Sequence, residues 1–167
     1  MSTPAFEIGP ATPADLDALE RLEALCFDAS VAVSRRQFRY LLSSPASSIY
    51  VLRHEGRVVA DEIVTCRRDR HGLSGRLYSL AVDPACRGTG YGRDLLVHAL
   101  GVLRAQGARH VALEVSAENV PAIALYESLG FRTAGRLIDY YGPGEDGWRL
   151  VLRSEATSQS SMGEGVG

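Results

Sequence analysis

Three alternating glycines in the middle of the chain, Gly88, Gly90 and Gly92, are the residues that point most directly to chemistry. They lie between an apolar, strand-like stretch that ends at Val82 and a stretch with helical spacing that begins at Gly92. Glycine leaves the backbone N–H groups of such a turn uncovered, and the helix start adds the positive end of its dipole. The pattern predicts a cradle for a phosphate group. An ordinary strand-to-helix turn is the alternative, although it does not need three alternating glycines.

The composition excludes two classes of phosphate-binding or amine-handling enzyme. All 18 Lys+Arg residues are arginine, so the chain contains no lysine. A Walker-type phosphate loop requires a lysine after its last glycine, and a Schiff-base enzyme requires a lysine nucleophile. The dinucleotide fingerprint G-x-G-x-x-G is also a poor match, because Arg93 stands where its third glycine would fall.

Length and composition predict one domain without a metal or a membrane span. The chain has 167 residues, 46% of them hydrophobic, which is enough for a single core. A formal net charge of -2 gives no basic excess for nucleic acid or an anionic membrane. No apolar run approaches the ~20 residues that cross a bilayer, and residues 1–10 do not resemble a signal peptide. The spacing of Cys26, Cys66 and Cys86 fits neither a disulfide framework nor a metal site, so we expect a metal-free, cytoplasmic protein.

The glycine turn must be held by the elements around it, and periodicity predicts a mixed α/β architecture. We expect strands at residues 6–9, 49–53, 58–66, 76–82, 110–116, 131–136 and 148–153. We expect helices at residues 12–27, 34–42, 92–106 and 119–129, with loops at 67–75 and 139–147. This order implies one sheet with helices on both faces. Residues 1–153 would form the domain, and residues 154–167 a Ser/Gly-rich tail.

Several motifs in the second half of the chain resemble those of a known enzyme family. Residues 87–92 read R-G-T-G-Y-G, which is similar to the R/Q-x-x-G-x-G/A loop of the GNAT N-acetyltransferases. The triplet L-E-V around Glu114, then Asn119, the stretch A-L-Y-E-S-L-G-F (residues 124–131) and the pair Tyr140-Tyr141 follow in the order and spacing of the RimI type. Enzymes of that type acetylate the N-terminal amine of a small-subunit ribosomal protein. The resemblance covers residues 77–152 and implies a single domain with a mostly antiparallel sheet of about seven strands, splayed between the fourth and the fifth.

The resemblance also implies acetyl-CoA as cosubstrate and names the residues that would hold it. The glycine loop would bind the pyrophosphate, and the end of the preceding strand would pair with the pantetheine arm. A backbone amide near Val82 would point at the thioester carbonyl, and Asn119 would reach the cofactor, although it fits a plain helix cap equally well. The implied cofactor-binding residues are Leu80, Ala81, Val82, Arg87, Gly88, Thr89, Gly90, Tyr91, Gly92, Arg93 and Asn119.

Glu114 and Tyr126 are the catalytic residues that the resemblance implies. Alternation places Glu114 opposite the apolar side of its strand, where an ordinary polar residue would also lie. As general base it would act through water, because an α-amine of pKa about 7.7–8.0 needs little help near neutrality. Tyr126 would be the general acid for the departing thiolate, since a phenol of pKa about 10 keeps its proton at neutral pH. By helical spacing alone, Tyr126 would be a core tyrosine.

The acceptor is the part of the reaction that the resemblance specifies least. In the family, the loop with Tyr140 and Tyr141 helps to shape the acceptor site, although an aromatic turn covering the core edge is the alternative. Residues 28–37, one wall of that site in the family, lack the F-x-x-x-P-W-S-type stretch of ribosomal-protein acetylators, and residues 137–139 lack the usual basic residue. We predict an acetyl-CoA-dependent N-acetyltransferase that acts on a primary amine, preferentially the N-terminal α-amine of a peptide or protein, by direct attack in a ternary complex.

Two other functions remain open from the sequence. A small amine such as a polyamine, an amino acid or an aminoglycoside would fit an acidic pocket formed by Asp28, Asp61, Glu62 or Asp139. A non-catalytic acyl-CoA-binding domain would not need both Glu114 and Tyr126. The expected partners are acetyl-CoA and the acceptor, without nucleic acid or membrane, in a monomer or a homodimer.

Overall fold

The structure is a computed structural model that describes residues 6–154. The predicted tail, residues 154–167, lies outside the described residues except for Ser154. No helix between residues 6 and 154 has both the length and the apolar character that a bilayer span requires. The elements, in chain order, are β1 (Phe6–Pro10), α1 (Leu16–Cys26), α2 (Arg35–Ser43), β2 (Ser47–His54), β3 (Arg57–Asp69), β4 (Gly72–Val82), α3 (Tyr91–Ala105), β5 (His110–Ser116), α4 (Val120–Ser128), β6 (Arg132–Gly142) and β7 (Glu145–Arg153).

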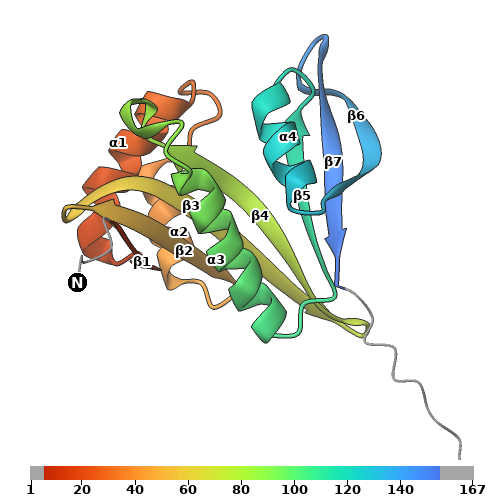
Figure 1. Ribbon diagram of the computed structural model, residues 1–167, viewed down its shortest axis with the longest axis horizontal. Helices are drawn as coiled ribbons and strands as arrows, with labels where there is room; N and C mark the ends of the chain where they lie inside the picture. The colour runs from red at the N-terminus through yellow and green to blue at the C-terminus, as the bar shows by residue number, and fades with distance from the viewer. Residues whose placement is uncertain (1–5, 155–167) are drawn as a thin grey trace, which may run out of the picture.

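The strands form one seven-stranded sheet in the order β1-β2-β3-β4-β5-β7-β6. Every neighbouring pair is antiparallel except β4 and β5, which are parallel. This parallel pair is joined at only two positions, Gly75 with Val111 and Arg76 with Ala112, and the two strands then diverge (Figure 1). The predicted fold class, including the splay between the fourth and fifth strands, is confirmed.

Helices cover both faces of the sheet, as predicted, and each face has its own core. α1 and α2 cover one face, where Leu19, Leu22 and Phe38 pack with Val51 and Ile63. Successive strand residues point to opposite faces, so the β3 residues on either side of Ile63 point to the other face of the sheet.

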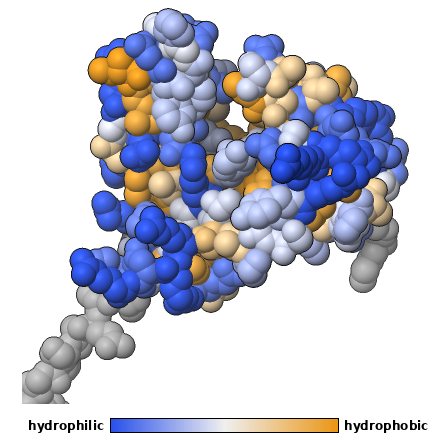
Figure 2. Space-filling model, turned by 180° about the vertical axis from the view of Figure 1, so that it is seen from behind, coloured by the Kyte–Doolittle hydropathy of each residue, from blue (hydrophilic) through white to orange (hydrophobic). Residues whose placement is uncertain are grey.

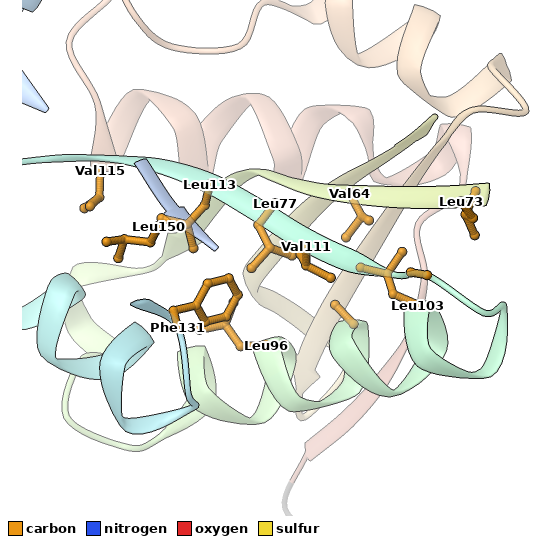
Figure 3. Close-up of a cluster of buried hydrophobic side chains, with 12 residues drawn as sticks. Val64, Leu73, Leu77, Leu96, Leu103, Val111, Leu113, Val115, Phe131 and Leu150 are labelled. Atoms are coloured by element: carbon orange, nitrogen blue, oxygen red, sulfur yellow. The ribbon is translucent and has the colours of Figure 1, made fainter. Parts of the chain in front are cut away.

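α3 and α4 cover the opposite face and share a core that bridges the splayed strands. Figure 3 shows Leu96 of α3 beside Phe131 and beneath Leu77 of β4, and Leu103 of α3 farther along the helix next to Val111 of β5. Apolar side chains from both halves of the sheet meet in this cluster, which keeps the halves together although their backbones separate.

A bulge in β4 changes which residues of this strand face each side. Ile63 pairs with Ser79 and Val64 pairs with Leu77, so Tyr78 is an extra residue in β4. Leu77 and Leu80 therefore both contribute to the cores on the α3 face, while Ser79 points toward α1. The bulge lies where β4 borders the splay, at the edge that β5 leaves uncovered.

Two predicted loops are wrong. Residues 67–75 form the ends of the β3–β4 hairpin, which turns tightly near Gly72, and most of residues 139–147 belong to β6 and β7. Charged and glycine-rich composition suggested a loop in both places. Cross-strand pairing at the solvent-exposed end of a hairpin tolerates such residues, because the backbone hydrogen bonds do not depend on them.

Candidate active site

A cleft of about 650 Å³ lies between β4 and β5, where the two strands diverge. Viewed from behind, the molecule is hollowed between the two halves of the sheet (Figure 2). Elements of both faces contribute to the cleft, since residues of α1 and of α4 line it. Its polar and titratable lining residues are Glu23, Cys26, Glu62, Arg76, Tyr78, Ser79, Glu114, Ser116, Asn119, Tyr126, Tyr140 and Tyr141.

Glu114 is held in this cleft by two arginines. Its Oε2 accepts a hydrogen bond from Arg76 Nε at 3.0 Å and forms an ion pair with Arg76 Nη2 at 2.8 Å, and its Oε1 accepts a hydrogen bond from Arg149 Nη2 at 3.4 Å. The side chain is only 11% exposed. Because Leu113 and Val115 point into the core beneath α3, Glu114 points to the opposite face, the side of α1 and α2.

Tyr126 lines the same cleft from α4, on the other face of the sheet. Its ring packs edge-to-face on Phe131, with ring centroids 5.8 Å apart, so it also takes part in the core. Burial raises the pKa of the Tyr126 hydroxyl above the usual tyrosine value, and ionisation of Glu62 would raise this pKa further. Tyr126 therefore combines both predicted roles, a core aromatic and a hydroxyl that keeps its proton.

Asp61 and Glu62 are adjacent in β3, fully buried, and point to opposite faces of the sheet. None of their four carboxyl oxygens has a hydrogen-bond partner within the described chain. Asp61 lies on the α1 side, where the charge of Glu23 is felt, whereas Glu62 lines the cleft together with Tyr126. Burial raises the pKa of Glu62 well above its ordinary value of 4.5, and the charge of Asp61 adds to this effect.

Glu23 brings a third glutamate to the cleft, from the α1 side. Its Oε2 accepts a hydrogen bond from the backbone N–H of Val33 at 2.9 Å, and its Oε1 accepts one from Ser79 Oγ at 3.5 Å. Burial raises its pKa, and these two hydrogen bonds oppose the rise. Glu23 thus ties α1 both to the segment before α2 and to the β4 bulge.

The predicted glycine loop leads directly into α3, and two of its glycines have a left-handed backbone conformation. Gly88 and Gly90 have φ of +82° and +85°, which other residues rarely adopt, and no atom would contact an added Cβ at either position. Gly92 instead lies against Val82 and Leu80, whose side chains would be 3.4 and 3.7 Å from a Cβ added at this glycine. The loop is exposed, and the 15-residue helix α3 begins directly behind it.

Other residues of this loop make contacts that fix its shape. Thr89 Oγ1 donates to the carbonyl of Cys86 at 2.6 Å, and Arg93 Nη1 donates to Ser128 Oγ of α4 at 2.9 Å. Tyr91 packs edge-to-face on Phe6, with centroids 5.5 Å apart. Tyr91 therefore packs against the protein, whereas Thr89 and Arg93 make their hydrogen bonds at the exposed surface of the loop.

Asn119 both caps α4 and lines the cleft. Its Oδ1 accepts a hydrogen bond from the backbone N–H of Ala122 at 3.3 Å, as an N-cap does. Of the other predicted cofactor-binding residues, Leu80 lines the cleft, and Ala81 and Val82 continue β4 past the point where its pairing with β5 ends. The backbone edge of β4 next to the splay is therefore available to an extended ligand.

Tyr140 and Tyr141 line the cleft on the β6–β7 side, where their rings contact edge-to-face with centroids 4.9 Å apart. Burial raises the pKa of Tyr141 to about 12. A Cβ at Gly147 would lie 2.9 Å from the Tyr141 ring, so glycine is required there for the ring to lie flat on β7. Val31 and Val33, in the segment between α1 and α2, line the facing wall.

The acidic pocket that would suit a small cation is not assembled from the four predicted carboxylates. Of these, only Glu62 lines the cleft. Asp28 and Asp139 are exposed, and Asp139 accepts a hydrogen bond from the Gly144 N–H at 2.7 Å. Among residues 6–154, no group of three or more His, Cys, Asp or Glu side chains is arranged to hold a metal ion.

Sequence reasoning identified Glu114, Tyr126 and Asn119 as neighbours in one site but missed several others. No sequence motif marked Arg76, Arg149 or Glu23, because their positions in the site depend on strand pairing and helix packing. Glu62 carried one signal, a pair of adjacent acidic residues inside the apolar run V-V-A-D-E-I-V. Such a pair breaks the rule that fully buried strands are apolar, and only the fold shows which member faces the cleft.

Comparisons of the chain with protein families and with known proteins point to the same family. Residues 16–131 match the Acetyltransferase (GNAT) family. N-alpha-acetyltransferase 30 of Schizosaccharomyces pombe is 31% identical over 128 residues, which span 75% of this chain and 84% of that protein. Mycothiol acetyltransferase of Acidothermus cellulolyticus is 51% identical over 65 residues, 39% of this chain but only 20% of that protein.

The fold has a close counterpart among solved structures. The crystal structure of the ribosomal-protein-S18-alanine N-acetyltransferase from Escherichia coli superposes with a TM-score of 0.80 and 30% sequence identity. The superposition covers 92% of this chain and 97% of the Escherichia coli chain. Similarity to this structure therefore extends over both halves of the sheet and the cleft between them.

Proposed function

The chain belongs to the GNAT acetyltransferase family, and on that premise we propose that it transfers the acetyl group of acetyl-CoA to the N-terminal α-amine of a peptide or protein. The observation that carries this proposal is the cleft that passes through the sheet between β4 and β5. Glu114 lines it from one face and Tyr126 from the other. A base could therefore remove a proton from the amine on one side while an acid protonates the thiolate leaving group on the opposite side.

Acetyl-CoA fits the loop and the strand edge. The backbone amides of residues 88–92 and the start of α3 would hold the pyrophosphate, with Thr89 and Arg93 keeping the loop in shape. The free edge of Leu80, Ala81 and Val82 would hydrogen-bond the pantetheine arm as an added strand does. Bound acetyl-CoA supplies an activated acetyl thioester.

Glu114 would act on the amine, on the α1 side of the sheet. Arg76 and Arg149 fix its carboxylate, which leaves lone pairs free to receive a proton through a water molecule. An α-amine of pKa about 7.7–8.0 is partly neutral near pH 7, so this assistance is modest. A backbone amide near Val82 would stabilise the charge that develops on the acetyl oxygen.

Tyr126 would give its proton to sulfur as the C–S bond breaks. It lies on the α4 side, and its raised pKa means that it holds a proton at any pH at which the amine reacts. The ring is fixed by its contact with Phe131, so the hydroxyl is positioned before substrate arrives.

A peptide is favoured as acceptor because the cleft is open and flanked by aromatic side chains. Tyr140 is 47% and Tyr141 38% exposed, as suits residues that would contact an extended chain. The relatives include N-alpha-acetyltransferase 30 and the S18-alanine enzyme, whose names indicate protein N-termini as acceptors. Three glutamates line the cleft, but the carboxylate of Glu114 is ion-paired with Arg76 and Arg149, so a small cationic amine is the second candidate acceptor.

The experiment that tests the proposal is a turnover screen with acetyl-CoA. Peptides with different free N-termini, including ribosomal-protein N-terminal sequences, are compared with polyamines, amino acids and aminoglycosides by release of the free CoA thiol. We expect turnover with a subset of the peptides. Turnover with a small amine alone would replace the peptide by that amine, and acetyl-CoA binding without any turnover would favour a non-catalytic acyl-CoA-binding domain.

A further inference from the structure

Glu62 is a carboxyl group in the cleft to which the proposed reaction assigns no role. It is 0% exposed, and neither of its oxygens has a hydrogen-bond partner among residues 6–154. Burying a polar group without a hydrogen-bond partner is unfavourable, so such a group calls for an explanation. Glu62 also lines the cleft, which places it where a role in the reaction can arise.

The position of Glu62 separates it from Glu114. β2 pairs Tyr50 with Glu62, and Tyr50 packs on His98 of α3, so Glu62 points to the α3 and α4 face. Glu114 points to the opposite face and is held by its arginines. Among the described residues that line the cleft, the carboxyl group of Glu62 and the phenol of Tyr126 therefore lie on the leaving-group side.

We propose that Glu62 is a proton-relay residue that resupplies Tyr126 when Tyr126 protonates the departing thiolate. The inference rests on the proposed acetyl transfer. As the N–C bond forms and the C–S bond breaks, the Tyr126 hydroxyl proton goes to sulfur. The Glu62 carboxyl proton goes through a water molecule to the Tyr126 oxygen, because the two groups are not hydrogen-bonded to each other. One amine proton leaves before attack and the other as the amide forms. One of these two recharges Glu62 through water, and the other is released to solvent, so atoms and charge balance.

The protonation states of the two groups agree with this direction. Burial and the charge of Asp61 raise the pKa of Glu62, which favours the protonated acid. Burial raises the pKa of Tyr126 as well, which means that a phenolate is unfavourable there and needs immediate reprotonation. The titratable and charged groups on the elements around Glu62 are Tyr50 (β2), Asp61 (β3), Arg76 (β4), His98 (α3), Glu114 (β5), Tyr126 (α4) and Tyr141 (β6).

The test is a double-mutant cycle of Glu62→Gln and Tyr126→Phe with the best peptide acceptor. Glu62→Gln should lower kcat at least about tenfold and leave KM for acetyl-CoA within about threefold. In the Tyr126→Phe background the same substitution should lower kcat by less than about twofold, because Glu62 acts through Tyr126. Fold-changes that simply multiply would overturn the relay.

Asp61→Asn is the matched control. Asp61 is adjacent in β3, equally buried and equally without a hydrogen-bond partner in the described chain, but it faces α1. Any loss caused by Asp61→Asn should be the same in both backgrounds. A loss that disappears with Tyr126→Phe would show that the cycle reports on buried charge in general, and the assignment to Glu62 would fall.

The pH profile gives a readout that a structural role would not change. Because Glu62 must be protonated, wild-type kcat should fall as pH rises through the raised pKa of this group. That fall should be absent in Glu62→Gln. A wild-type profile without it, or a variant that keeps it, would contradict the relay.

A second variant covers the case in which Glu62→Gln does not fold. Glu62→Met removes the buried polar atoms and should fold at least as well, with the same loss of kcat. Failure of both variants to fold would assign Glu62 a structural role and overturn the proposal. If the wild-type protein binds acetyl-CoA and acetylates no amine, the proposed function fails, whereas wild-type turnover with multiplying losses removes the relay alone.

Discussion

Glu114 and Glu62 line one cleft from opposite faces of the sheet, and the chain holds them in opposite ways. Glu114 accepts hydrogen bonds from two arginines, whereas Glu62 is fully buried and, within residues 6–154, has no hydrogen-bond partner. Ion pairing fixes the orientation of a carboxylate, and burial without a partner favours the protonated acid. In the proposed reaction, this difference would let one residue type receive a proton on one side and give a proton on the other.

The largest effect is expected from a change in the proposed acetyl-CoA site, because the proposed proton transfers on both faces of the sheet depend on bound acetyl-CoA. Gly90→Glu places a side chain and a negative charge at a φ of +85° in the loop that would bind the pyrophosphate. Acetyl-CoA affinity, measured by calorimetry, should fall more than about 100-fold, because strain and repulsion act together. Gly101→Glu, at an open position in α3, should bind acetyl-CoA as wild type does. Undiminished binding by Gly90→Glu would disprove the phosphate cradle.

Removing the hydroxyl of Tyr126, which lies on the same face of the sheet as Glu62, should have the next largest effect. Tyr126→Phe keeps the ring contact with Phe131, so kcat should fall about 100-fold while acetyl-CoA binding stays nearly intact. Steady-state kinetics and a binding isotherm give the two values. Tyr78→Phe, another tyrosine of the cleft, serves as control and should stay within about twofold. Wild-type turnover by Tyr126→Phe would remove the general acid from the account.

On the other side, Glu114→Gln should lower kcat/KM about 30-fold at pH 7. The variant's own rate should rise toward pH 9, because the acceptor amine, of pKa about 7.7–8.0, then arrives neutral. Initial rates across this pH range test the expectation. Glu118→Gln, at an exposed position just before α4, should follow the wild-type profile. A loss that does not depend on pH would mean that Glu114 only positions the substrate.

The buried carboxyl group of Glu62 should also change how the free energy of unfolding depends on pH. Because the pKa of Glu62 is raised in the folded protein, the unfolded chain releases this proton first as pH rises. The free energy of unfolding should then decrease from about pH 4.5 upward, by as much as about 1.4 kcal/mol per pH unit for this group. Urea unfolding at pH 5 and pH 8 should show Glu62→Gln gaining stability relative to wild type at the higher pH. An equal difference at both values would contradict the raised pKa.

The smallest effect concerns the two arginines that hold Glu114. Arg76 makes two contacts at 3.0 and 2.8 Å, and Arg149 makes one at 3.4 Å. Arg76→Gln should lower kcat/KM about threefold and Arg149→Gln less than twofold, with stability changes within about 1 kcal/mol for these exposed side chains. Kinetics and thermal unfolding of the two variants give the comparison. A larger effect of Arg149→Gln would reverse the order that the distances predict.

Much of the fold could be predicted because local patterns and the sheet agree. β5 has the predicted bounds, since V-A-L-E-V alternates between the core and the cleft, and Asn119 with Gly130 bounds α4 as cap and stop. The strands of the β3–β4 and β6–β7 hairpins are longer than predicted. In β3, for example, Arg67, Arg68 and Asp69 lie at the end of the strand, where pairing with the next strand is not a local property of the sequence.

The site could be predicted only where residues match a motif. Glu114 and Tyr126 matched, and they do line one cleft, but their catalytic roles stay predictions. The arginine pair around Glu114 and the face of Glu62 arise from pairing between β4, β5 and β7 and from the β4 bulge. No single segment of sequence encodes these contacts, since a shift of one residue in register would reverse each side chain.

The most direct test of the account is the position of the transferred acetyl group. A mixture of one peptide with a free N-terminus, the same peptide with a blocked N-terminus and a polyamine is incubated with acetyl-CoA and the protein. Tandem mass spectrometry then locates the product. We predict acetylation of the free α-amine and of neither competitor. An acetyl group on the polyamine, with the free peptide unmodified, would contradict the central claim.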